Sequence, residues 1–423
     1  MIKTSSAALL TVMIAATPTW AADVVVPQPS APLTSPDSVY NWTGFFIGLG
    51  GGTGYLIDQL SVPAIGSTDI SGIGGRGYFG QVHVGYDHLF SNGFVLGAAV
   101  SGRYGRVDTS WDIPGLNGTA DADYGFDVIG RVGYAITPRT MAFLLGGYTW
   151  QHFEITPNTG SSTDWSQSGY VLGLGLETAL RGNWTWRSEY RYADYGDNRL
   201  TDVGNVSVDP VTHTFHTTVN YRFGGGPSTI QRDPFQYNWT GLKLGGAVSV
   251  GVSHNKLRSP GGGIEIDSLS TEGYLGEINI GYDWEFRDRW VAGVMLAGEY
   301  IDASSSASFS GYDVRADAGD FGFDAVLRGG YKFNDYTLGY VLGGYTYQEL
   351  FASASFGGVT ETRDIGVNAL TLGTGTELAL NERTSAYIEY RYTIYEDVDL
   401  GSLLTIEPTS HTVRVGAKFK LFD

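Results

Sequence analysis

The chain has 423 residues, a formal net charge of −18 at pH 7 and no cysteine. An acidic balance argues against nucleic-acid binding, which needs a basic surface, and a cysteine-free chain has no disulfides, thiolate zinc sites or cysteine nucleophiles. Its 61 glycines are about twice the number expected from average usage, and glycine at this frequency, with 13% aromatic residues, favours many short, curved strands.

The N-terminus has the three parts of a secretory signal peptide. Lys3 supplies the positive charge, residues 7–16 the apolar stretch and residues 19–21 (Thr-Trp-Ala) the cleavage site. We therefore expect residues 1–21 to be removed and residues 22–38 to form a Pro-rich periplasmic segment. No later stretch offers the roughly 18 apolar residues of a transmembrane helix. An exported chain of this kind either dissolves in the periplasm or enters the outer membrane as a β-barrel.

The rest of the chain contains two copies of one unit. The sequence Tyr-Asn-Trp-Thr-Gly begins at Tyr40 and again at Tyr237, a spacing of 197 residues. Glu-Tyr-Arg-Tyr begins at Glu189 and again at Glu389, a spacing of 200 residues. Repetition at a nearly constant spacing indicates tandem homologous units.

We place these β units at residues 39–223 and 237–423. Between them, residues 224–236 are rich in Gly and Pro, and we expect a flexible linker without strands there. A connection of this length separates domains, whereas a single continuous barrel needs only a short turn at that point. The sequence therefore favours two tandem barrels, with one fused barrel of about sixteen strands as the alternative.

Each unit contains about eight segments that alternate with period two, the pattern of β-strands. Over residues 170–181, one face carries Leu172, Leu174 and Leu176, and the other carries glycines and Glu177. A soluble sandwich would bury the leucines in its core. In an outer-membrane barrel the leucines meet lipid, and the glycines and charges fill the interior.

The connections between these segments alternate between short and long. In the first unit, residues 135–139 and 181–183 are short connections, whereas residues 102–121 and 151–168 are long ones. Short periplasmic turns and long external loops are typical of transmembrane barrels. The sequence therefore predicts an all-β protein of the cell outer membrane, with antiparallel up-and-down barrels of eight strands each.

The ends of the units resemble a known family. After the signal peptide and residues 23–27 (Asp-Val-Val-Val-Pro) comes the stretch 41–48 (Asn-Trp-Thr-Gly-Phe-Phe-Ile-Gly), and residues 413–419 close the second unit as Val-Arg-Val-Gly-Ala-Lys-Phe. These sequences resemble the opacity-protein-like surface antigens of α-proteobacteria, nearly end to end in each unit. The resemblance implies a surface antigen that contacts lipopolysaccharide and host surface factors and is assembled by the barrel-insertion machinery. The family norm is one barrel, and this chain departs from it by carrying two.

Charged residues on the polar strand faces are the candidate functional residues. Side chains just fill the interior of an eight-stranded barrel, and a buried charge needs a partner of opposite sign. We therefore predict a salt-bridge network that plugs each barrel, with a charged channel constriction as the alternative. The residues are Asp127, Arg131, Glu177, Glu189 and Arg191 in the first unit and Asp324, Arg328, Glu377, Glu389 and Arg391 in the second.

The sequence gives weaker support for catalytic and metal-binding residues. His213 and His411 recur at equivalent positions, where we expect them at the barrel rim, and no Ser or acidic residue recurs with them at a telling distance. The sequence shows no spaced calcium loop, so we predict no catalytic site, metal or cofactor. Tryptophans are expected to include anchors at the membrane interfaces; the candidates are Trp42, Trp184, Trp186, Trp239, Trp284 and Trp290.

These expectations describe a non-enzymatic outer-membrane protein that contributes to envelope integrity and to surface contacts. Outer-membrane lipid is its expected environment, and its long loops are the expected contact surfaces, because connections carry recognition. A general diffusion porin, formed by one fused sixteen-stranded barrel, is the alternative.

Overall fold

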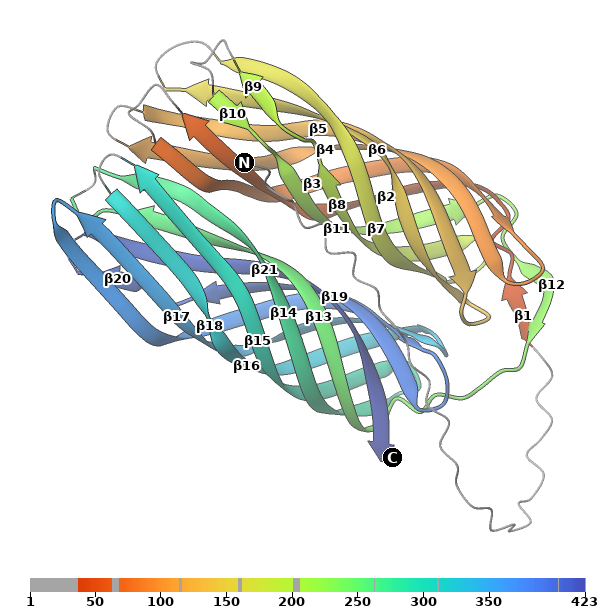
Figure 1. Cartoon of the computed structure of the whole chain (residues 1–423). Coiled ribbons are helices and arrows are strands. Elements are labelled where there is room, and N and C mark those ends of the chain that lie inside the picture. Colours follow the sequence, from red (N-terminus) through yellow and green to blue (C-terminus); the bar gives the residue numbers. More distant parts are fainter. Residues whose placement is uncertain are drawn as a thin grey trace. The chain divides into compact units, whose positions relative to one another are not determined.

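The computed structural model describes residues 37–62, 68–113, 116–158, 162–200, 206–261, 263–309, 312–401 and 403–422. The expected signal peptide and nearly all of the Pro-rich segment lie outside these residues. Within these residues, all of the regular secondary structure is β-strand (Figure 1). This described part contains no helix that is long and apolar enough to cross a membrane.

Eight antiparallel strands of the first unit close into a barrel. Each strand pairs with the next, and β11 pairs with both β8 and β2, so the ring of strands is complete. The strands are β2 (Gly44–Val62), β3 (Thr68–Leu89), β4 (Phe94–Ile113), β5 (Leu116–Ala135), β6 (Thr140–Pro157), β7 (Thr163–Ala179), β8 (Trp184–Asp194) and β11 (Val211–Arg222).

The second unit closes in the same way, because β21 pairs with both β19 and β13. Each unit thus forms its own eight-stranded barrel, and the alternative of one sixteen-stranded barrel is wrong. The strands are β13 (Gly241–Arg258), β14 (Glu265–Phe286), β15 (Trp290–Phe309), β16 (Tyr312–Asn334), β17 (Thr337–Phe356), β18 (Val359–Ala379), β19 (Thr384–Tyr395) and β21 (Leu404–Phe422).

Most of the expected long loops are strand. Of residues 102–121, only 114 and 115 fall between β4 and β5, and these two lie outside the described residues. In the second barrel, Gly357 and Gly358 alone join β17 to β18, with φ angles of 58° and 82° that suit a two-residue hairpin turn. The strands remain paired beyond their apolar parts, in segments made mostly of polar residues. Because apolar and polar residues no longer alternate there, the sequence pattern does not reveal these segments as strands. We call these strand extensions the outer hairpins.

Short strands complete the fold. β9 (Asn198–Leu200) and β10 (Val206–Val208) pair with each other, and β20 (Val398–Leu400) pairs with β21. β1 (Asp37–Tyr40) forms a two-stranded ribbon with β12 (Pro227–Arg232). The structure therefore differs from the expected strand-free linker, since β12 lies within residues 224–236. Pro227 is tolerated there because it is the first residue of its strand.

Side-chain alternation separates the two faces of each barrel wall. On β14, Ile278 is 72% exposed, while its neighbours Glu277 and Asn279 are buried. On β7, Leu172 is exposed and Val171 is buried. Successive strand residues point to opposite faces, so apolar residues cover the outside, as a lipid-facing wall requires. The same alternation aims the charged residues into the bore.

Candidate functional site

All ten predicted charged residues lie on inward faces and are buried, with exposed fractions of 7% or less. They come from equivalent strands: β5, β7 and β8 in the first barrel and β16, β18 and β19 in the second. In each barrel they form two groups. The inner cluster lies near the short turns, and the middle cluster lies farther along the bore toward the outer hairpins.

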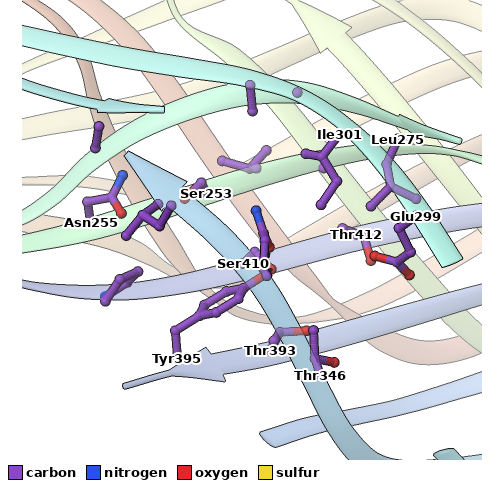
Figure 2. A pocket seen from close by; sticks show the side chains of 18 of the residues that line it. Ser253, Asn255, Leu275, Glu299, Ile301, Thr346, Thr393, Tyr395, Ser410 and Thr412 are labelled. Atoms are coloured by element: carbon purple, nitrogen blue, oxygen red, sulfur yellow. Dashed lines mark hydrogen bonds between the residues drawn. The ribbon is translucent and has the colours of Figure 1, made fainter. Parts of the chain in front are cut away.

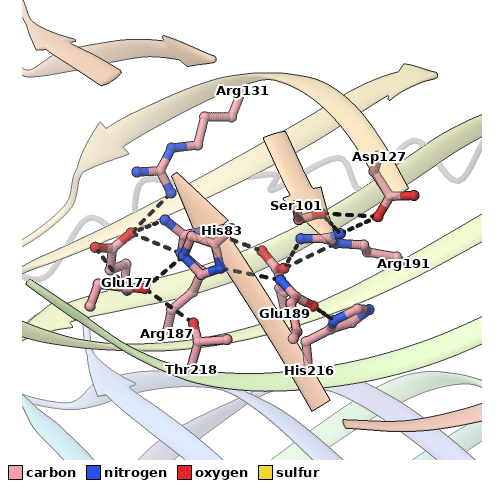
Figure 3. A network of polar contacts seen from close by, with 12 residues as sticks. His83, Ser101, Asp127, Arg131, Glu177, Arg187, Glu189, Arg191, His216 and Thr218 are labelled. Atoms are coloured by element: carbon pink, nitrogen blue, oxygen red, sulfur yellow. Dashed lines mark hydrogen bonds and ion pairs between the residues drawn. The ribbon is translucent and has the colours of Figure 1, made fainter. Parts of the chain in front are cut away.

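The inner cluster of the first barrel is built around Glu177. Arg131 Nη1 and Arg187 Nε donate hydrogen bonds to its Oε2 atom at 2.9 and 3.0 Å, and Arg222 Nε donates to its Oε1 atom at 3.0 Å. Asp87 accepts further hydrogen bonds from Arg131 Nε at 2.8 Å and from Arg222 Nη2 at 2.7 Å. Two carboxylates and three guanidinium groups thus cross-link strands on opposite sides of the bore. Figure 3 shows Arg131, Glu177 and Arg187 of this cluster.

The middle cluster of the first barrel centres on Asp127. Its Oδ1 atom accepts a hydrogen bond from Arg103 Nη1 at 2.6 Å, and its Oδ2 atom accepts one from Arg191 Nη1 at 2.5 Å. Thr149 donates its hydroxyl to Oδ1 at 2.6 Å. Arg191 also donates through Nε to Glu189 Oε1 at 3.0 Å. Figure 3 shows Asp127, Arg191 and Glu189 of this cluster side by side.

The second barrel repeats the inner cluster with different cations. Arg328 donates to Glu377 Oε2 through Nη1 at 2.5 Å and to Asp283 Oδ1 through Nε at 2.8 Å, as Arg131 does at the matching positions. Lys418 Nζ donates to Glu377 Oε2 at 3.2 Å. Lys243 Nζ lies 3.6 Å from Glu377 Oε1 and 2.8 Å from Asp283 Oδ2. Glu377, like Glu177, therefore faces three cationic groups.

The middle cluster of the second barrel is richer in carboxylates. Arg391 contacts Asp324 and donates through Nε to Glu389 Oε1 at 2.5 Å. Arg414 contacts both Glu277 and Glu299. Oxygen atoms of Glu277, Glu299 and Asp324 lie within 4.8 Å of one another, a grouping that could hold a metal ion. The two guanidinium groups already supply positive charge at this position.

Several partners of the ten residues were not among the predicted set. Asp87, Arg187 and Arg222 complete the inner cluster of the first barrel, and Arg414 takes part in the middle cluster of the second. The signal that could have found them is the same period-two alternation, because each lies an even number of residues from another inward residue of its strand.

The repeated Asn-Trp-Thr-Gly sequence closes the end of each barrel near the short turns. Trp42 and Trp239 are both 0% exposed, so they are not membrane-interface anchors. The guanidinium carbon of Arg222 lies 4.9 Å from the ring centroid of Trp42, and Lys243 Nζ lies 5.1 Å from that of Trp239. Such placement is favourable for a cation over an aromatic face. Trp184, Trp284 and Trp290, by contrast, are about half exposed on the outside.

Local backbone geometry explains why this sequence turns inward. The Asn41 side chain accepts a hydrogen bond from the Thr43 backbone at 3.0 Å, and Asn238 does the same for Thr240. The next residue, Gly44, has a φ of 137°, and a Cβ atom there would lie 2.4 Å from the Phe223 carbonyl oxygen. A side chain is excluded at that glycine, which lets the preceding tryptophan fold under the barrel.

The two recurring histidines are placed on the strands rather than at a catalytic centre. His213 Nδ1 shares a hydrogen bond with the Tyr190 hydroxyl at 2.7 Å, and His411 Nδ1 shares one with the Tyr390 hydroxyl at 2.8 Å. His411 is the eighth residue of β21 rather than its first, so its expected rim position is wrong. The repeated His–Tyr pair joins neighbouring strands in each barrel.

Comparisons with known proteins agree with this architecture. A family model described as "Outer membrane protein beta-barrel domain" matches residues 7–223 and 231–419. The 31 kDa outer-membrane immunogenic protein of Brucella melitensis biotype 1 is 33% identical over 232 residues, which are 49% of this chain and 95% of that protein. The 22 kDa outer membrane protein of Rhizobium leguminosarum bv. viciae is 33% identical over 37% of this chain and 65% of its own length.

Among solved structures, the attachment invasion locus protein Ail of Yersinia pestis is 17% identical and has a TM-score of 0.23. The match covers 42% of this chain and 98% of that one.

Proposed function

This chain belongs to the family of outer-membrane β-barrel proteins, and on that premise we propose that it is a structural surface protein whose two barrels are plugged by their own side chains. The observation that carries the proposal is the position of Glu177 and Glu377. Each is 0% exposed and faces three cationic side chains from other strands. These contacts cross the bore where an open channel would need water.

The energetics of buried charge support a plug rather than a conducting constriction. Removing one partner from a buried ion pair costs about 3–5 kcal/mol, because the other charge is left uncompensated. Each inner cluster shares its charges among several strands, so opening the bore would break many of these contacts together. The proposed role is therefore mechanical: the clusters hold the barrel wall together and the barrels contribute to envelope integrity without catalysing a reaction.

Planar lipid bilayers containing the full chain test the plug directly. We expect no stable single-channel openings in a potassium chloride solution, because both inner clusters block the bore. Stable openings on the nanosiemens scale would overturn the proposal. An open porin of known conductance, inserted under the same conditions, controls for the sensitivity of the measurement.

The second part of the proposal concerns the cell surface. The Brucella relatives are named as outer-membrane immunogenic proteins, and we infer that the outer hairpins of this chain are its antigenic and partner-binding surface. Exposed Trp184, Trp284 and Trp290 on the barrel exterior suit the polar boundary of the outer membrane. Lipopolysaccharide and outer-membrane lipid are the proposed surroundings, the barrel-insertion machinery the proposed assembly partner, and host surface factors the proposed external partners.

An inserted epitope distinguishes the two ends of a barrel. One tag is placed between Gly357 and Gly358 in an outer hairpin, and a second variant carries it between Arg287 and Asp288 in a short turn. All four residues have positive φ angles, so both sites are tight turns. We expect antibody to label intact cells only for the first variant. Labelling of the second alone would reverse the proposed orientation.

A further inference from the structure

The second barrel contains a hollow between its middle cluster and its outer hairpins. Its cavity volume is about 70 Å³, compared with about 30 Å³ for the equivalent space in the first barrel. Figure 2 shows the hollow with Leu275, Ile301 and Tyr395 on its walls and Glu299 at its inner end. All of its lining residues come from strands or connections of the second barrel. It lies beyond the proposed plug and does not depend on an open bore.

The repeat explains why, among the described residues, the hollow of the second barrel is larger than its counterpart in the first. Leu350 occupies the position of Phe153, 197 residues earlier, and Leu275 occupies that of Phe79, 196 residues earlier. In the first barrel, the Phe153 ring stacks on Trp165 with a centroid distance of 5.3 Å and meets Tyr195 edge-on at 5.5 Å. Leu350 leaves space where the first barrel has the Phe153 ring, whereas the smaller side chain of Leu275 is offset by Ile301, which stands where the first barrel has Gly105.

The walls of the hollow are mostly apolar. Leu275, Ile301, Leu350 and Val367 line it from four different strands and contribute much of its apolar surface. Polar side chains, including Tyr395 and Arg414, line the rest of it. A concave apolar surface with a small number of convergent polar groups is the usual form of a small-molecule site. The hollow therefore has the form of a binding pocket, and its inner end determines the charge of the ligand it suits.

The inner end of the hollow differs in charge from its counterpart. Glu299 stands where the first barrel has Arg103, 196 residues earlier, and Glu277 stands where it has Gln81. Among the described residues, the middle cluster of the first barrel has two carboxylates and two guanidinium groups. That of the second has four carboxyl groups and two guanidinium groups, so carboxyl groups outnumber guanidinium groups by two. Uncompensated buried charge is costly, and a bound cation would relieve it.

We propose that this hollow binds small amphiphilic cations, with an ammonium group next to Glu299 and an aromatic or alkyl body against Leu275 and Leu350. The carboxylate excess selects positive charge, since a neutral molecule gains nothing from it and an anion is repelled. The enlarged apolar wall accepts the body of the ligand, which a fully hydrated metal ion would not need. The first barrel, with a balanced cluster and a smaller hollow, does not bind such a ligand.

Isothermal titration calorimetry on the full chain in a neutral detergent tests this site. The probe is 2-phenylethylammonium, and 2-phenylethanol and 3-phenylpropionate are its neutral and anionic counterparts of similar size. We expect one saturable site for the cation and at least tenfold weaker binding of the other two. Equal binding of all three probes, or no saturable binding of the cation at millimolar concentration, would overturn the proposal.

Variants locate the binding. Leu350→Phe restores the side chain of the first barrel and leaves the charge network intact, so it should weaken cation binding at least tenfold. Glu299→Gln should reduce the preference for the cation over 2-phenylethanol. The matched control Phe153→Leu, in the first barrel, should leave cation binding unchanged. Folding of each variant is checked by the difference in electrophoretic mobility between unheated and heated samples. Unchanged cation binding in a folded Leu350→Phe protein would refute the assigned location.

Discussion

Gly97 on β4 lies so close to Asp87 on β3 that a Cβ atom on the glycine would be 1.9 Å from the Oδ1 atom of the carboxylate. The second barrel repeats the relationship, with 2.0 Å between a Cβ at Gly293 and Oδ1 of Asp283. In each barrel the inner-cluster aspartate occupies the space that a side chain on the glycine would need. The glycine is therefore part of the charge network although it carries no charge.

We predict that Gly97→Ala destabilises the first barrel by about 3 kcal/mol, the lower end of the cost of breaking a buried ion pair. The methyl group displaces Asp87 from Arg131 and Arg222. Urea unfolding in lipid vesicles, followed by tryptophan fluorescence, measures the change. Gly102→Ala on the same strand is the control, because a Cβ there has no neighbour within 4 Å. Equal losses for the two variants would contradict the mechanism.

Removing the central guanidinium group of the inner cluster has a larger effect on stability than on conductance. We expect Arg131→Ala to lower the free energy of unfolding by about 3–5 kcal/mol, since it leaves Glu177 and Asp87 short of a partner. Arg106→Ala is the control on the exterior: its ion pair with Asp121 is at 2.7 Å, but the arginine side chain is 69% exposed. Exposed pairs contribute only about 0–1 kcal/mol. Stable ion conduction with unchanged stability in Arg131→Ala would favour a channel constriction instead.

The alternation of apolar and polar residues predicts much of this architecture. Once one residue of a strand is known to point into the barrel, the inward or outward direction of its neighbours follows. The pattern places Asp127 and Arg131 on one face of β5, and both side chains point inward in the structure. Alternation does not extend to Trp42, which precedes the first residue of β2. Its inward position follows from the Asn41 turn and the φ angle of Gly44, neither of which a strand pattern contains.

Two other features depend on contacts between distant segments. β12 pairs with β1 across more than 180 residues, so the composition of residues 224–236 alone indicates a linker and no strand. The hollow of the second barrel depends on the volumes of side chains that meet from different strands. Its origin becomes visible only when Leu350 is compared with Phe153 inside a closed ring of strands.

Closure of the short-turn end by Trp42 gives a third prediction. Trp42→Ala should lower the free energy of unfolding by about 3–5 kcal/mol, the usual cost of removing a buried large aromatic side chain. The substitution also removes the ring that lies against the Arg222 guanidinium group. Thermal unfolding in detergent, read by electrophoretic mobility, measures it. Trp284→Ala, on the exposed exterior, should cost less, and an equal or larger loss there would contradict a closing role for Trp42.

The strand pairing predicts that the two barrels stay folded after the chain is cut between them. β11 returns to β2 and β21 returns to β13, so neither ring needs a strand from the other half of the chain to close. A protease recognition site inserted between Asp233 and Pro234, beyond the end of β12, allows cleavage of the purified, folded protein. We expect two fragments. Before heating, the electrophoretic mobility of each fragment should differ from its mobility after heating, as it does for a folded barrel. Loss of that heat-dependent shift in both fragments immediately after cleavage would mean that the halves depend on each other, and the division into two self-closed barrels would fail.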